Sequence, residues 1–113
     1  MYNSGFIPIK AMSINSAWKG RRFKTKAYEK WQESILWSLP HEEEMLKSRT
    51  LGMSFIFYLK SPTRMDLDNL LKGLIDCVKK KGIIEDDRYV FYLEATKRKT
   101  EKEEGFEIEI IEI

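Results

Sequence analysis

Hydrophobic and polar residues alternate along several parts of this chain with a period of two. The alternation is clearest over residues 51–60, 88–97 and 105–113. It predicts β-strands there, because successive side chains of a strand point to opposite faces. Residues 5–12 form a shorter candidate strand. Pro8 lies inside it and cannot donate a backbone hydrogen bond, which favours an edge position.

Two other parts of the chain repeat their apolar residues with the period of an α-helix. One opens at residue 25 or 26 and stops before Pro40. The other follows Asp68, which is a predicted N-cap, and ends at Gly82, a residue type that favours helix C-termini. Its expected buried stripe consists of Leu67, Leu70, Leu71, Leu74, Ile75, Cys77 and Val78.

These elements follow one another in the order β-α-β-α-β-β. The order predicts one small α/β (α+β) domain over residues 1–113, with a four-stranded mixed sheet and two main helices. The apolar arc of the second helix is about 160° wide, whereas a single core contact needs roughly 100°. The surplus is consistent with packing on a second copy of the chain, so a homodimer is predicted.

The composition is that of one folded domain in a reducing compartment. The chain has 113 residues, of which 42% are hydrophobic and 34% charged, and its net charge is only +2. These values exclude a disordered chain and a uniformly basic clamp. Cys77 lies on the apolar side of the second helix and is expected to be a buried, inert thiol. No signal peptide or membrane-spanning run is evident, so we expect a cytoplasmic protein without a membrane partner.

Positive charge is concentrated between residues 19 and 26, and the aromatic residues Trp18, Phe23 and Tyr28 lie within or beside this run. This mixture suits contacts to DNA phosphates and stacking on an exposed base, although an ordinary solvated loop has the same composition. Asn15 is a candidate contact to phosphate or to a metal site, and equally a plain turn residue. The basic candidates for DNA binding are Lys19, Arg21, Arg22, Lys24 and Lys26.

Acidic residues gather around the start of the second helix. Asp66 and Asp68 are two residues apart, so in an extended segment both carboxylates point the same way. Clustered carboxylates favour a hard divalent cation such as Mg²⁺ or Mn²⁺, which can activate water for attack on a phosphodiester. The alternative is a purely structural role, in which these acids are helix caps and surface ion-pair partners. Further polar groups on the helix face and just after the helix are Asn69, Lys72, Asp76, Asp86 and Asp87.

At these residues the sequence resembles the RusA family of Holliday-junction resolvases. The resemblance rests on residues 66–72, which read D-L-D-N-L-L-K, on the later acids and Gly82, and more loosely on residues 13–16 and the basic run. It implies a dimeric, metal-dependent endonuclease of bacterial, phage or prophage origin. The metal ligands that the resemblance implies are Asp66, Asp68 and Asp87, and the lysine required for cleavage is Lys72. Asn69, Asp76 and Asp86 would support them.

The sequence therefore predicts an Mg²⁺-dependent endodeoxyribonuclease. It would resolve four-way DNA junctions by paired symmetric nicks, in DNA recombination and repair. Two alternatives stay open. One is a non-catalytic nucleic-acid-binding module, and the other is a nuclease for a different branched DNA. A lysine placed among several acids favours catalysis over binding alone.

Overall fold

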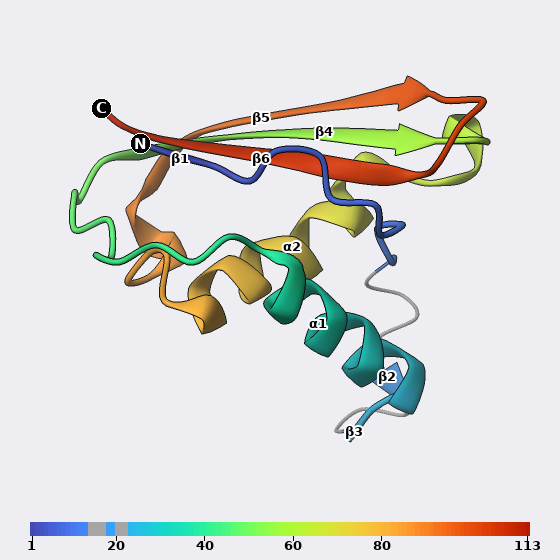
Figure 1. The fold of residues 1–113 in the computed structure, drawn as a ribbon, viewed down its shortest axis with the longest axis horizontal. Helices are drawn as coiled ribbons and strands as arrows, with labels where there is room; N and C mark the ends of the chain where they lie inside the picture. The colour runs from blue at the N-terminus through green and yellow to red at the C-terminus, as the bar shows by residue number, and fades with distance from the viewer. Residues whose placement is uncertain (14–17, 20–22) are drawn as a thin grey trace.

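The computed structural model describes residues 1–13, 18–19 and 23–113 and arranges them in two layers, a β-sheet with the helices on one of its faces (Figure 1). The other face of the sheet is not covered by a helix of the described residues. The strands of the main sheet are β1 (Tyr2–Asn3), β6 (Gly105–Glu112), β4 (Leu51–Leu59) and β5 (Val90–Lys99), in that spatial order. A separate hairpin pairs β2 (Trp18–Lys19) with β3 (Phe23–Lys24).

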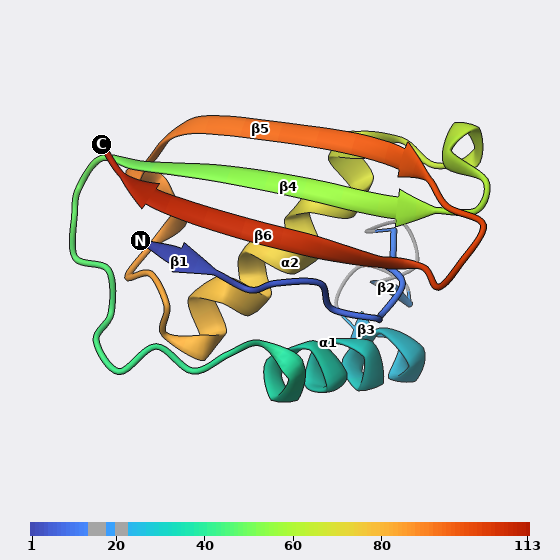
Figure 2. The ribbon, with the colours of Figure 1, turned by 45° about the horizontal axis from the view of Figure 1, so that its top comes forward.

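The helices are α1 (Lys26–Ser38) and α2 (Leu67–Lys81), with short 3-10 turns η2 (Pro62–Arg64) and η3 (Asp87–Tyr89). Figure 2 shows α2 crossing obliquely beneath the sheet and α1 lying beside it. The predicted order of elements, the mixed sheet and the two main helices are therefore confirmed. Within the described ranges, no helix is both long enough and apolar enough to cross a membrane.

Strand β4 is the centre of the sheet and explains why the sheet is mixed. It pairs in parallel with β5 and antiparallel with β6. A parallel neighbour requires a crossover connection, and α2 supplies it between β4 and β5. The alternate residues of β4 that face the helices are at most 1% exposed and form the middle of the core. They are Leu51, Met53, Phe55, Phe57 and Leu59.

The two helices approach each other closely at Gly73. A Cβ atom at this position would lie 2.7 Å from the hydroxyl oxygen of Tyr28 and 2.9 Å from a ring carbon of Trp31. Glycine therefore lets α2 lie directly against the aromatic residues of α1. Cys77 is buried in the same core, as its place in the apolar stripe predicts.

The helix boundaries agree with the sequence prediction except at the start of α2. Thr25 caps α1 by accepting a hydrogen bond from the backbone N–H of Tyr28 at 3.2 Å, and Gly82 ends α2 in the left-handed conformation with φ of 82°. Asp68 was predicted as the N-cap of α2, but Asp66 occupies that position and Asp68 lies in the first turn. The backbone at Asp66 is extended, and helical geometry begins at Leu67.

The first strand also differs from the prediction. Pairing begins earlier, at β1, and continues only as an isolated bridge between Ile7 and Phe106. Gly5, with φ of 67°, interrupts the extended backbone, and Pro8 has no N–H to donate beyond it. Strand β5 likewise begins two residues later than predicted, because η3 precedes it. Of the predicted DNA contacts, Asn15, Arg21 and Arg22 lie outside the described residues.

Candidate active site

The loop before α2 is held in place from β5. After β4 the chain makes η2 and then runs extended through Met65 to Asp66. The ammonium group of Lys97 donates hydrogen bonds to the carbonyl oxygens of Pro62 at 2.9 Å and Met65 at 2.8 Å. The second of these carbonyls belongs to the peptide unit that immediately precedes Asp66. Lys97 therefore keeps this segment non-helical, which explains why α2 begins at Leu67.

Asp66 and Asp68 consequently lie together at the N-terminal end of α2. Both residues are exposed. The N-terminus of a helix carries a partial positive charge, so two carboxylates are tolerated there at less cost than elsewhere on the surface. Asn69, the next residue of the motif, is half-buried in the same turn. The two aspartates that are close in sequence thus both face solvent at the start of α2.

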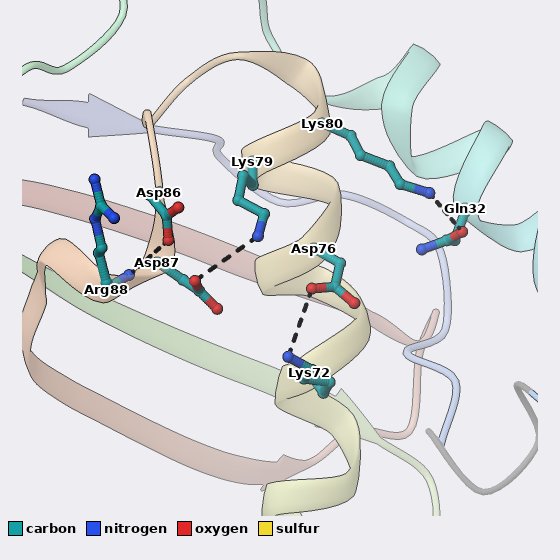
Figure 3. Close-up of polar contacts among 8 residues, drawn as sticks. All are labelled: Gln32, Lys72, Asp76, Lys79, Lys80, Asp86, Asp87 and Arg88. Atoms are coloured by element: carbon teal, nitrogen blue, oxygen red, sulfur yellow. Dashed lines mark hydrogen bonds and ion pairs between the residues drawn. The ribbon is translucent and has the colours of Figure 1, made fainter.

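A row of alternating charges continues from Asp68 along one face of α2. The ammonium group of Lys72 lies 3.8 Å from the carboxylate of Asp76, and that of Lys79 lies 3.8 Å from the carboxylate of Asp87 (Figure 3). Lys80 instead reaches across to Gln32 of α1, at 3.3 Å. Because the side chain of Lys72 is 59% exposed, its ion pair is weak and can be exchanged for a phosphate at little cost.

Asp86 and Asp87 follow α2 and play different parts. The carboxylate of Asp86 accepts a hydrogen bond from the backbone N–H of Arg88 at 3.0 Å and caps η3. That bond is the main cause that holds the pKa of Asp86 below its usual value. The neighbouring Asp87 and the charges of Lys79 and Arg88 act in the same direction, and desolvation opposes them. Asp86 is thus engaged in local structure. Asp87 points toward α2 and contacts Lys79 (Figure 3).

Asp87 does not join Asp66 and Asp68 within one chain. It contacts Lys79, which follows Asp68 by eleven residues. At a rise of about 1.5 Å per residue, this places Lys79 about 16 Å along the helix axis from Asp68. In the part of the chain that the structure describes, no three histidine, cysteine, aspartate or glutamate residues are grouped so as to hold a metal ion. The three-aspartate metal site therefore stays a prediction.

The pair at the start of α2 nevertheless has the right donor chemistry for a divalent cation. Mg²⁺ is commonly held by one or two carboxylates, with water and substrate phosphate oxygens completing its coordination. Asp66 and Asp68 present such carboxylates to solvent. Lys72, one turn further along α2, would lie beside a phosphate bound there. The donor set fits the metal, while the position of Asp87 remains to be explained.

Comparison with known proteins identifies the family of the chain. The family model of endodeoxyribonuclease RusA matches residues 10–111. The chain belongs to the RusA family. It is 27% identical over 95 residues to the crossover junction endodeoxyribonuclease RusA of Aquifex aeolicus (strain VF5), an alignment that covers 80% of this chain and 73% of that protein. The resemblance found at residues 66–72 is thus confirmed as membership of the RusA family.

Within this RusA-family chain, the sequence pattern alone missed the role of Lys97. The alternation over residues 88–97 makes it only the last residue of a predicted strand, whereas it lies inside β5 opposite the buried Phe57. The alternation of β5 carries the signal that could have identified it, since Lys97 shares a face with Leu93 and Ala95. Among the predicted DNA contacts, Lys19 and Lys24 belong to the hairpin β2–β3, and Lys26 is exposed at the start of α1.

Proposed function

We propose that this chain is a metal-dependent endodeoxyribonuclease that resolves four-way DNA junctions by paired symmetric nicks, as a step in DNA recombination and repair. The observation that carries the proposal is the exposed pair Asp66 and Asp68 at the start of α2, one turn from Lys72, in a chain that the RusA family model matches over residues 10–111. The relative's name as a crossover junction endodeoxyribonuclease supports the choice of substrate.

The residues at and around the start of α2 would have separate roles in catalysis. Asp66 and Asp68 would hold Mg²⁺, with Mn²⁺ as an alternative, and that ion would supply an activated water and stabilise the leaving oxygen. Lys72 would exchange Asp76 for the scissile phosphate and neutralise its charge. Lys97 would keep Asp66 in place through the carbonyl of Met65. Lys26 and the basic residues before it would bind the arms of the junction.

Paired nicks in two strands need two active sites, and a homodimer supplies them by symmetry. The surface beside the acids suits a second copy of the chain. Leu71 and Ile75 of α2 are only partly buried, and Leu93 of β5 faces the helix layer yet is 47% exposed. Phe91 on the same strand is 72% exposed. We propose that these four residues form the dimer surface.

A dimer built on this surface would also explain the position of Asp87. At 100° per residue, Asp68, Leu71, Ile75 and Lys79 fall within an arc of about 80° on α2. Two α2 helices that pack antiparallel along this arc about a two-fold axis would bring the start of one helix beside the end of the other. Asp66 and Asp68 of one copy would then lie near the second copy's Lys79–Asp87 pair. Each site would take its third aspartate from the partner.

The activity is tested with a labelled synthetic four-way junction and a plain duplex, each with Mg²⁺ and with EDTA. The proposal expects paired symmetric nicks in the junction, only with metal. Binding without cutting would instead favour the non-catalytic nucleic-acid-binding module. This alternative is kept because Asp87 does not join Asp66 and Asp68 within one chain. Cutting of flaps or forks in preference to the junction would favour the nuclease for other branched DNA.

The shared site is tested by mixing two inactive variants, Asp68→Asn and Asp87→Asn. If each site takes Asp68 from one copy and Asp87 from the other, a mixed dimer has one fully intact site and nicks one strand. If each chain holds its own site, every site in the mixed dimer lacks one acid and no nicking returns. Subunits would be exchanged by mild denaturation and refolding, and each variant refolded alone is the control.

A further inference from the structure

A second charged cluster lies away from the acidic pair, around the hydroxyl group of Tyr89. Arg49 donates a hydrogen bond to this oxygen at 2.8 Å, and Arg88 donates another at 2.7 Å. The guanidinium carbons of the two arginines lie 5.1 Å and 4.9 Å from the centre of the tyrosine ring. Two positive groups that are 39 residues apart in the chain therefore converge on one oxygen atom.

The cluster is built on rigid supports. The ring of Tyr89 is 8% exposed and packs in the hydrophobic core, so its hydroxyl group has a fixed position. Arg88 precedes it in η3, whose N-terminus Asp86 caps. Arg49 comes from the segment just before β4, and its side chain is brought to the site by the contact with Tyr89. Two separate segments thus meet at one buried anchor.

The cluster has donors in excess and no anion of its own. Neither Arg49 nor Arg88 forms an ion pair with a carboxylate in the described part of the chain. Glu85 and Asp86 act on Arg88 only at longer range, as lesser causes of its raised pKa after the hydrogen bond to Tyr89. The Tyr89 hydroxyl oxygen already accepts two hydrogen bonds, and its own proton has no acceptor among the described residues.

We propose that Arg49, Arg88 and Tyr89 form a binding site for a backbone phosphate of the DNA substrate. The inference rests on the proposed function for the nature of the substrate. Guanidinium groups bind phosphate oxygens through paired N–H donors, and the free tyrosine proton adds a third donor. A phosphate here would neutralise two neighbouring positive charges that form no ion pair with a carboxylate of the described residues.

The phosphate held here is not the one that is cut. Arg49 lies just before the start of β4, whereas Asp66 follows its end. The nine residues of β4 span about 26 Å at 3.3 Å per residue. Within one chain, the cluster therefore lies a comparable distance from that chain's own Asp66 and Asp68. It acts in substrate binding, so its loss is expected to raise KM.

The test compares Arg49→Gln with Lys47→Gln as a matched control. Lys47 is exposed two residues earlier and makes no hydrogen bond or ion pair within the described ranges. Junction binding of the full chain is measured in EDTA at several NaCl concentrations. For Arg49→Gln we expect about tenfold weaker binding at low salt, and the slope of log Kd against log[NaCl] smaller by about 1, the value for one lost phosphate contact. Lys47→Gln should keep the wild-type slope.

Three results would overturn the inference. They are an unchanged Kd and slope in Arg49→Gln, an equal loss in Lys47→Gln, and dissociation of a dimer by Arg49→Gln. The last would mean that the anion is a carboxylate of a second copy. Tyr89→Phe keeps the buried ring and removes the oxygen, so it should also weaken binding while thermal melting reports an intact fold. Because binding is measured without metal, failure of the wild-type chain to cut would count against the proposed function alone.

Discussion

Replacing Lys97 with methionine would remove the contact that holds the loop before Asp66. The ammonium group donates to Pro62 and Met65 at 2.9 Å and 2.8 Å, and no carboxylate forms an ion pair with it in the described part of the chain. Methionine has a similar length and keeps the apolar stem of lysine. The variant therefore deletes two hydrogen bonds and one charge with little change of packing.

The size of the effect follows from these two bonds. A hydrogen bond from a charged donor contributes about 1.5–3 kcal/mol when buried. Lys97 is only half-buried, and water can solvate the released carbonyls, so the two bonds together contribute about as much as one buried bond of this kind. We expect Lys97→Met to lower the free energy of unfolding by about 2 kcal/mol, which corresponds to roughly 8 °C in Tm for a domain of this size.

The larger consequence is expected at the metal site. Residues that orient a metal ligand commonly change metal affinity by about 10–100-fold when they are removed. Lys97→Met should therefore raise the Mg²⁺ concentration for half-maximal junction cutting by about tenfold, with Kd for the junction in EDTA nearly unchanged. Isothermal titration with Mn²⁺ gives a second reading of affinity that does not depend on cutting. Hydrogen exchange of residues 61–67 should rise in the variant.

The control is Lys99→Met, which removes the same charge from the same face of the same strand. Lys99 is 66% exposed and pairs only with Glu101, at 3.4 Å, among the described residues. Lys97→Arg keeps the charge and donors and should restore part of the metal affinity. Equal effects of Lys97→Met and Lys99→Met, or faster exchange in the loop without any change in metal affinity, would refute the positioning role.

Three further results are expected. Asp68→Asn should reduce cutting by more than roughly 100-fold, because loss of a residue that only orients a metal ligand already costs up to that much. The variant should keep junction binding in a gel-shift assay. Loss of binding as well would contradict this separation of roles. Saturating Mg²⁺ should raise Tm, because only the folded chain gathers the acids, and a flat response would indicate isolated surface aspartates. Burial, and secondarily the charge of Asp76, raises the pKa of Tyr28 to about 12 from 10.0. Its stabilisation is therefore complete below pH 10 and is lost as the pH rises toward 12, so urea unfolding of Tyr28→Phe should show a shallower alkaline decline. Identical declines would show that burial of this hydroxyl does not govern alkaline stability.

Much of the fold followed from local pattern because its signals lie within a few residues of one another. The alternation at residues 51–60 and the helical spacing at residues 67–81 reflect which side chains share a face, and each pattern corresponds to a real element. Gly82 ended α2 as predicted, since a left-handed residue is needed there and glycine adopts it without strain. The start of α2 was misplaced by two residues, because Asp66 and Asp68 are equally suitable N-cap residue types and the local sequence does not distinguish them.

The acidic motif at residues 66–72 could be predicted for the same reason, since its residues are close in sequence. Two acids two residues apart and a lysine one helical turn later stay close in any fold that starts a helix there. The position of Asp87 could not be predicted from local sequence in this way. The position of Asp87 depends on the length of α2, because Asp87 follows this helix and Asp66 precedes it. Within one chain the helix therefore separates the two residues.

By itself, then, the amino-acid sequence determined the elements, their order and the presence of a carboxylate pair with a lysine, because these depend on neighbours within about one or two turns of chain. Only the tertiary structure decided which distant groups meet. Lys97 reaches Met65 across 32 residues and Arg49 reaches Tyr89 across 40. Such contacts depend on the crossover from β4 through α2 to β5, which brings the segments together through packing of the core, and no local pattern in the sequence names the two partners.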